Sequence, residues 1–147
     1  MEAGRIYTAV PDHHLLVRDH RVALSDGPWE SGLRPAIDAL FRSVALDYGP
    51  RAIGVPMSGL LNDGVAGVRA IKAMRGVTVV QDPTDAPFPD LPRNALNAGV
   101  ADYTTSASQA GSLLAQLAER NINAQAADQA EHAITVLSPR FFSPKTP

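Results

Sequence analysis

The sequence predicts an α/β protein with a mainly parallel sheet and helices on its faces. Short apolar runs at residues 52–57 and 77–80 have the length and composition of buried strands. Residues 34–48, 65–74 and 107–120 space their apolar side chains as one face of a helix. Strands that alternate with helices are typical of parallel sheets, because the crossover between two parallel strands is usually a helix. The 147 residues and their 45% hydrophobic content suit one domain with a sizeable core.

The first third of the chain predicts a strand, a hairpin and a helix. Residues 6–10 form the strand, and residues 15–17 and 22–24 pair as a hairpin that turns at residues 18–20. In the helix over residues 34–48, Pro35 suits the first turn, where its missing N–H is not needed. The buried face of this helix consists of Ile37, Leu40, Phe41, Val44 and Ala45.

Two strands and a helix follow, marked by proline and glycine as well as by apolar spacing. The strand at residues 52–57 contains Pro56, which removes a donor from the ladder. The helix at residues 65–74 ends at Gly76, which we place at the C′ position. Residues 77–80 then form a short apolar strand.

The last part of the chain predicts a loop, a short helix, a strand and a closing helix. A loop at residues 82–91 holds three prolines, and loops of this length tend to be functional. The elements after it are a helix at 93–97 that Pro92 starts, a strand at 100–104, and a helix at 107–120 with a capping box formed by Ser106 and Gln109. We therefore expect a domain at residues 1–120 and a C-terminal tail at residues 121–147 that is helical at first and then disordered, with Phe141 and Phe142 as its apolar anchor.

Composition excludes several classes of function. The formal net charge of −2 and the pI near 6.0 give no basic field for nucleic acid or for an anionic membrane surface. The absence of cysteine removes disulfides, CxxC redox chemistry and thiolate metal sites. No apolar run approaches the roughly 20 residues of a transmembrane helix, and no signal-peptide core follows the first residues. We expect a cytoplasmic protein without membrane insertion.

Residues 58–64 (SGLLNDG) are the strongest candidate for a functional site. They place Asp63 in a tight turn where a strand is followed by a helix. In open α/β sheets, ligands and catalytic groups lie in the crevice outside the carboxyl ends of the strands. The structural alternative is that Asn62 or Asp63 caps the helix that follows. Taken alone, the loop favours the cap.

Five segments of the chain carry a wider pattern. They are residues 5–15 (RIYTAVPDHHL), 34–45 (RPAIDALFRSVA), 58–64 (SGLLNDG), 80–86 (VQDPTDA) and 91–95 (LPRNA). In this order they resemble the catalytic domain of the CheB family, the chemotaxis protein-glutamate methylesterases, from Arg5 to about Ala118. The family motifs are a turn with Pro-x-x-His-Leu, a helix with Arg-Pro-Ser-Val-Asp-x-Leu-Phe, a Ser/Thr-Gly-x-x-x-Asp-Gly loop, a Gln-Asp/Asn strand end and Met-Pro-Arg-x-Ala. One such motif is weak, but five in order are strong.

The resemblance implies a three-layer, doubly wound, mainly parallel sheet with a β-hairpin, here lacking the opening strands. In the family, a nucleophilic serine in a Gly-x-Ser-x-Gly-Gly loop follows the first strand and a general-base histidine follows the second, and neither segment is found in this sequence. By the same resemblance, Asp63 is the carboxylate of a Ser-His-Asp triad. It would hold the histidine in the required tautomer and stabilise the imidazolium as the serine attacks a methyl ester. The resemblance implies no cofactor and no metal.

Substrate-binding residues are also implied by the resemblance: Ser58, Gly59, Leu60, Asn62 and Arg93, with Asp82, Phe88 and Pro92 as further groove candidates. An arginine at this cleft suits acidic residues that flank a methylated glutamate. The alternatives are structural: Arg93 is a surface residue of a short helix, Asp82 forms a turn and Pro92 starts a helix.

Ser58 and the four histidines of the chain are the internal substitutes to consider for the absent triad members. Ser58 directly follows a strand instead of standing on a sharp exposed elbow with oxyanion donors, so we expect its hydroxyl to bond loop backbone. His14 matches the turn histidine of the family, which is not the triad base. His13, His20 and His132 are expected in exposed or polar segments.

Two hypotheses on function follow. In the first, the chain is the later part of a methylesterase that acts on methylated chemoreceptors, with the serine and histidine on another segment and regulation by a separate receiver domain. In the second, it is a catalytically inactive remnant or a binding module in a two-component signalling pathway. In either case, the absence of the opening strands predicts an exposed sheet edge through which the chain self-associates.

Overall fold

The computed structural model describes residues 1–137, and of residues 125–137 it describes only the helical backbone. The chain divides into two compact units, residues 1–110 and 111–147. Its elements are β1 (His14–Arg18), β2 (Arg21–Ser25), α1 (Ile37–Tyr48), the short 3-10 helix η1 (Gly49–Arg51), β3 (Ile53–Gly54), α2 (Val65–Ala73), β4 (Val77–Gln81), α3 (Asp90–Asn97), β5 (Tyr103–Thr105) and α4 (Ala107–Leu137). The predicted anchor at Phe141 and Phe142 and the side chain of His132 lie outside the described residues.

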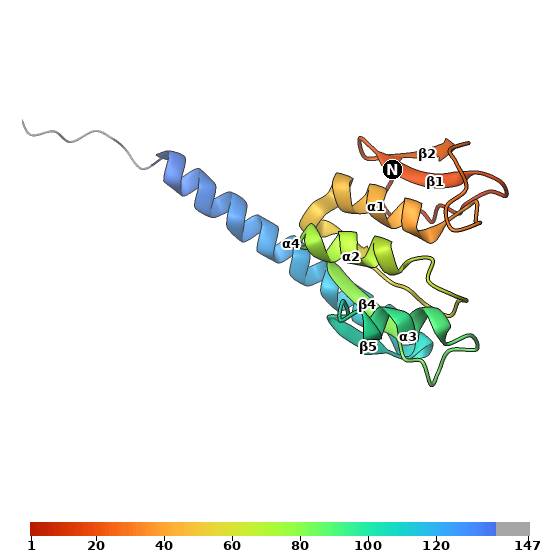
Figure 1. Cartoon of the computed structure of the whole chain (residues 1–147). Helices are drawn as coiled ribbons and strands as arrows, with labels where there is room; N and C mark the ends of the chain where they lie inside the picture. Colours follow the sequence, from red (N-terminus) through yellow and green to blue (C-terminus); the bar gives the residue numbers. More distant parts are fainter. Residues whose placement is uncertain (138–147) are drawn as a thin grey trace, which may run out of the picture. The chain divides into compact units, whose positions relative to one another are not determined.

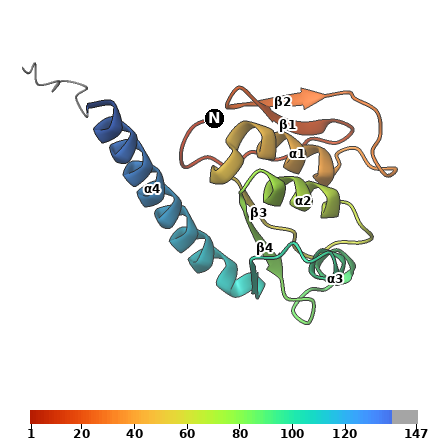
Figure 2. The same ribbon diagram turned by 60° about the vertical axis from the view of Figure 1, so that its left-hand side comes forward.

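A parallel sheet of order β3-β4-β5 confirms the predicted α/β class. Ile53 pairs with Val77 on one side of the sheet, and Val79 pairs with Tyr103 on the other. Helices α2 and α3 both contact β4, and α1 packs on α2, as Figures 1 and 2 show. Val79 and Val80 of the central strand are fully buried, so the core lies between this sheet and the helices.

Strand β3 is shorter than the predicted strand at residues 52–57. Backbone bonds from Val77 N to Ala52 O and from Gln81 N to Pro56 O extend its contact with β4 beyond the two residues of the strand itself. Pro56 has no N–H to offer a further neighbour, which interrupts the regular ladder. Among the described residues β3 pairs only with β4.

The prediction of a strand at residues 6–10 is wrong. These residues form no strand and are exposed, with Ile6 at 93%. Residues of high strand propensity form a strand only where a neighbouring backbone takes up their N–H and C=O groups. No strand in the described part of the chain pairs with this segment, which explains the difference.

The β1-β2 hairpin is confirmed. Asp19 and His20 form its two-residue turn with φ of 50° and 57°, the left-handed pair of conformations that matches the twist of the strands. The hairpin packs on α1, and the Ser43 hydroxyl accepts a hydrogen bond of 2.9 Å from Val17 N.

Two helix starts differ from the prediction. Helix α1 begins at Ile37, after the extended residue Ala36, so Pro35 lies before the helix and not in its first turn. Helix α3 begins at Asp90, and Pro92 lies within its first turn, so this helix starts three residues earlier than predicted. Proline is tolerated at such positions because the first N–H groups of a helix have no intrahelical acceptor.

The end of α2 is a Schellman motif centred on Arg75 and not on Gly76. Arg75 has a φ of 66°, its N–H donates to Lys72 O, and Gly76 N donates to Ile71 O. Gly76 lies one position beyond C′, and a glycine is required there for a steric reason. A Cβ on Gly76 would lie 2.7 Å from Ile71 Cγ2 and 2.8 Å from Ala52 O.

Helix α4 begins without the predicted capping box. Ser106 Oγ lies 3.1 Å from Ser108 Oγ, and the Asp85 carboxylate accepts the Ala107 N–H instead, at 2.8 Å. The helix runs unbroken to Leu137, beyond the predicted end at Arg120. The domain boundary that we place after Arg120 therefore falls inside a helix, and it stays a prediction.

We expect Gly67→Ala to destabilise the protein although alanine favours helices. A Cβ at this position of α2 would lie 2.5 Å from Phe41 Cβ and 3.1 Å from Asp38 Cα on α1. The resulting overpacking should cost about 1–3 kcal/mol in the free energy of unfolding. Urea titration measures it, with Gly111→Ala as the control, since nothing lies within 4 Å of that Cβ and the helix propensity gain should appear. A Gly67→Ala variant as stable as the wild type would contradict the close approach of α1 and α2.

Candidate functional site

Asp63 lies in the loop between β3 and α2, at the carboxyl end of a parallel strand. Its side chain is buried, at 6% exposure. Leu61, before Asp63, and Gly64, after it, have positive φ of 60° and 111°. These two left-handed residues turn the loop tightly, so Asp63 is directed inward.

Asp63 caps a helix, but not the helix that follows it. Its Oδ2 accepts a hydrogen bond of 2.8 Å from Ile37 N, and its Oδ1 accepts one of 3.0 Å from Asp38 N. These are the first N–H groups of α1, 25 residues and more away in the sequence. Helix α2 begins after Gly64 without a side-chain cap of its own. The expectation that Asn62 or Asp63 caps α2 is therefore wrong.

Asp38 returns the same contact in the opposite direction. Its Oδ1 accepts hydrogen bonds from Gly64 N at 2.9 Å and from Gly67 N at 2.6 Å, at the start of α2. Asp63, which precedes α2, thus stabilises the N-terminus of α1. Asp38, which belongs to α1, stabilises the N-terminus of α2. Both carboxylates are buried, and the partial positive charge of the two helix N-termini favours their negative charge.

Asp63 has acceptor capacity to spare. A carboxylate has about four lone-pair sites, and two of those on Asp63 are used by backbone N–H groups. The remaining sites can accept a hydrogen bond from an imidazole N–H, which is what a triad carboxylate does. No histidine within residues 1–124 bonds to Asp63.

His14 is a structural group. It is buried, its Nδ1 accepts the Ala36 N–H at 3.2 Å, and its Nε2 donates to Pro28 O at 2.9 Å. With one ring nitrogen accepting and the other donating to backbone, the ring is neutral and fully used.

Ser58 and Gly59 connect the Asp63 loop to residues 82–91 by hydrogen bonds. The Ser58 hydroxyl accepts the Phe88 N–H at 3.0 Å, as expected for a hydroxyl that bonds loop backbone. Gly59 N donates to Phe88 O, and Leu91 N donates to Gly59 O. These bonds join the Asp63 loop to residues 88–91.

Leu60 and Asn62 lie on the exposed side of the loop. Leu60 is 61% exposed. Asn62 Oδ1 accepts a hydrogen bond of 2.7 Å from Asn94 Nδ2, which also donates to Leu61 O at 2.9 Å. Arg93 is exposed and lies 3.9 Å from Asp90 on its own helix, so the loop is held by Asn94 and not by Arg93.

Sequence reasoning missed Asp38, Gln81 and Asn94 as parts of this site. Gln81 donates to Asp85 and accepts the Ser58 N–H at 2.7 Å, which joins the end of β4 to the loop. The Ala107 N–H and the Gln81 amide hold the pKa of Asp85 below its usual value. Asp85 therefore stays anionic and keeps its hydrogen bond with the Gln81 amide. All three residues stand in the segments that carry the family motifs, yet their partners lie in other segments.

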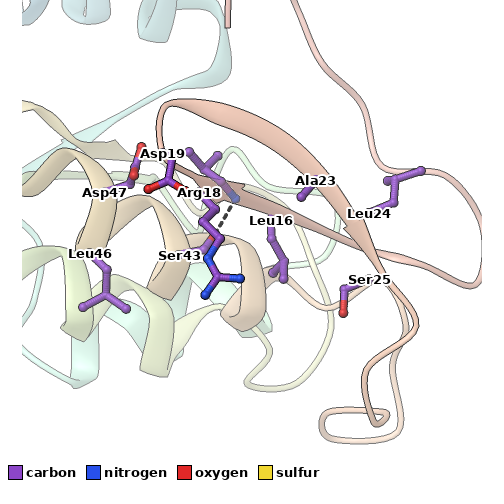
Figure 3. A pocket seen from close by; sticks show the side chains of 10 residues that line it. Leu16, Arg18, Asp19, Ala23, Leu24, Ser25, Ser43, Leu46 and Asp47 are labelled. Atoms are coloured by element: carbon purple, nitrogen blue, oxygen red, sulfur yellow. Dashed lines mark hydrogen bonds between the residues drawn. The ribbon is translucent and has the colours of Figure 1, made fainter.

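A separate hollow lies away from the Asp63 loop. It measures about 510 Å³ and lies between the hairpin and α1, with Leu16, Leu24 and Leu46 among its lining residues (Figure 3). No residue of the Asp63 loop lines it. Ser43 donates to Leu40 O, and Asp47 bonds to His20, so these polar groups are already used.

In residues 1–124 no cluster of three potential metal ligands is found, and no described helix is long and apolar enough to cross a membrane.

Comparisons with known proteins agree on one family. The profile of the family described as CheB methylesterase matches residues 1–114. A putative protein-glutamate methylesterase/protein-glutamine glutaminase of Leptospira interrogans is 35% identical over 123 residues, which cover 83% of this chain and 64% of that protein. The protein-glutamate methylesterase FrzG of Myxococcus xanthus is 37% identical over 117 residues, covering 79% and 35%.

A solved structure shows the same fold. The crystal structure of the Thermotoga maritima CheB methylesterase catalytic domain superposes with a TM-score of 0.64 at 24% identity, and the match covers 77% of this chain and 58% of that one. The chain spans less than two thirds of the length of the curated relatives named above.

Proposed function

The chain belongs to the CheB methylesterase family, and from this premise we propose that it is the aspartate-bearing part of a hydrolase that cleaves glutamate methyl esters on a signalling protein. The observation that carries the proposal is the Asp63 carboxylate, which is buried at the carboxyl end of a parallel strand and held by two backbone N–H groups. The names of the relatives, protein-glutamate methylesterase among them, support this substrate class.

In the proposed reaction, Asp63 acts on a histidine supplied by residues outside these 147. The serine Oγ attacks the ester carbonyl, the histidine takes the serine proton, and Asp63 stabilises the resulting imidazolium. The histidine then passes this proton to the departing methoxide, so methanol leaves and an acyl-serine forms. Water attacks the acyl-serine by the same steps and releases the glutamate carboxylate.

The other site residues fall into two groups by their contacts, and we propose a different role for each group. Leu60 and Asn62 are available to the substrate, because they lie on the exposed side of the loop. Ser58 and Gly59 position the loop through Phe88 and Leu91. We propose a methylated chemoreceptor or a similar signalling protein in the cytoplasm as the partner, with control by a receiver domain and self-association at the β3 edge as further expectations.

A complementation assay tests the proposal. We expect the chain alone to release methanol from a methyl-esterified glutamyl peptide at near background. Adding a separate segment that carries a Gly-x-Ser-x-Gly-Gly loop and a general-base histidine should restore turnover. Turnover of the chain alone that Ser58→Ala abolishes would instead establish an internal nucleophile.

The second candidate is a binding module without catalysis. One observation favours it: the reciprocal capping of α1 and α2 is by itself a sufficient structural reason for Asp63. A complemented assembly that binds the methylated peptide and releases no methanol would support this candidate and contradict the triad role.

A further inference from the structure

A polar groove lies next to the Asp63 loop. It measures about 490 Å³ and is lined by residues of the loop, of α2 and of α3. Asn62, the chain neighbour of Asp63, is one of its lining residues. The groove therefore borders the loop that carries Asp63.

Arg69 is the cationic side chain of this groove. It lies on α2 and is exposed, and within the described residues its guanidinium has no hydrogen-bond or ion-pair partner. The other arginine near the loop, Arg93, does not line the groove and lies near Asp90. An unpaired guanidinium presents five donors in a planar fork, which matches the two oxygens of a carboxylate.

The remaining lining groups favour a polypeptide with an acidic side chain over a phosphate. Asn97 offers an amide that can donate and accept, as a peptide backbone requires, and Val65 and Ala66 supply apolar surface. Asp38 also lines the groove, and its negative charge opposes a dianionic phosphate with a single arginine to balance it. A carboxylate carries a single charge, so Asp38 repels it less than a phosphate, and the Arg69 guanidinium can pair with it.

We propose that this groove, through Arg69, binds an acidic side chain that flanks the esterified glutamate of the substrate. The inference rests on the proposed function, and it moves the recognition of flanking acidic residues from Arg93 on α3 to Arg69 on α2. Arg69 is then a specificity-determining residue, and the substrate class becomes methyl-esterified glutamate within an acidic sequence.

Peptide binding to the full chain tests the proposal without any need for turnover. Two fluorescent peptides carry one glutamate methyl ester, flanked within four positions by glutamates in one and by glutamines in the other. An exposed arginine-carboxylate pair is worth up to about 1 kcal/mol, so fluorescence polarisation should show about fivefold tighter binding of the glutamate-flanked peptide. Arg69→Gln should abolish this preference, Arg69→Glu should reverse it, and the matched control Arg93→Gln should keep it. The preference should also weaken at high salt.

Several outcomes would overturn the inference. These are a wild-type chain that binds both peptides equally or binds neither, and a preference that survives Arg69→Gln. An equal loss of affinity for both peptides in Arg69→Gln would show a general structural effect and would also count against it. Circular dichroism confirms that the variants are folded. The complemented assembly could also release no methanol while the preference for the glutamate-flanked peptide still depends on Arg69. That result would contradict the proposed reaction and leave the groove assignment intact.

Discussion

In the complemented methylesterase, Asp63→Asn is expected to lower turnover about 10⁴-fold, the loss that the same change causes in the triad of a serine protease. The asparagine keeps the size of the side chain and one oxygen acceptor. It cannot stabilise the imidazolium by charge, and its NH₂ group disfavours the tautomer that the reaction needs. The initial rate of methanol release from a methyl-esterified peptide at saturating substrate measures the loss.

Asp38→Asn is the matched control for this experiment. Asp38 is buried like Asp63 and caps a helix of the same pair, but its two bonds go to Gly64 N and Gly67 N. We expect a far smaller loss of turnover in this variant. Equal losses in the two variants would contradict a triad role for Asp63, because they would attribute the effect to the geometry of the helix N-termini.

The second large effect concerns stability. Asp63→Ala should lower the free energy of unfolding by about 2–3 kcal/mol, because it removes a helix cap and two hydrogen bonds to a charged group in a buried site. Asp63→Asn should cost less, since its amide oxygen can still accept one of the two N–H groups. Urea unfolding of the wild type and of both variants gives the three values.

A double-mutant cycle with Asp38→Ala tests whether the two caps form one unit. Both aspartates join α1 to α2, so the losses should be non-additive, with a coupling of about 0.5–3 kcal/mol as found for residues in one network. The coupling should be absent between Asp63→Ala and Asp90→Ala, since Asp90 is an exposed residue of α3. An Asp63→Ala variant within about 0.5 kcal/mol of the wild type, the range of ordinary surface substitutions, would contradict the capping role.

The exact ends of the elements were the weak part of the sequence prediction. Residues 6–10 have the composition of a strand and yet form none, because pairing needs a neighbouring strand that composition does not supply. At the end of α2, the sequence marks Gly76 correctly as special. A close approach to Ile71 and Ala52 explains this glycine, whereas Arg75 takes the left-handed position.

By itself, the sequence determined the class of fold, the hairpin, the order of the strands and helices from the hairpin onward, and the loop that holds Asp63. These depend on apolar spacing, turn residues and family motifs, all of which are local in the chain. The tertiary structure alone decided which helix each buried aspartate caps and that Asn94 holds the loop. It also showed that Arg69, not Arg93, lines the groove beside Asp63. The physical reason is that these contacts join residues about 25 or more positions apart, and such pairs are set by how α1, α2 and α3 pack together.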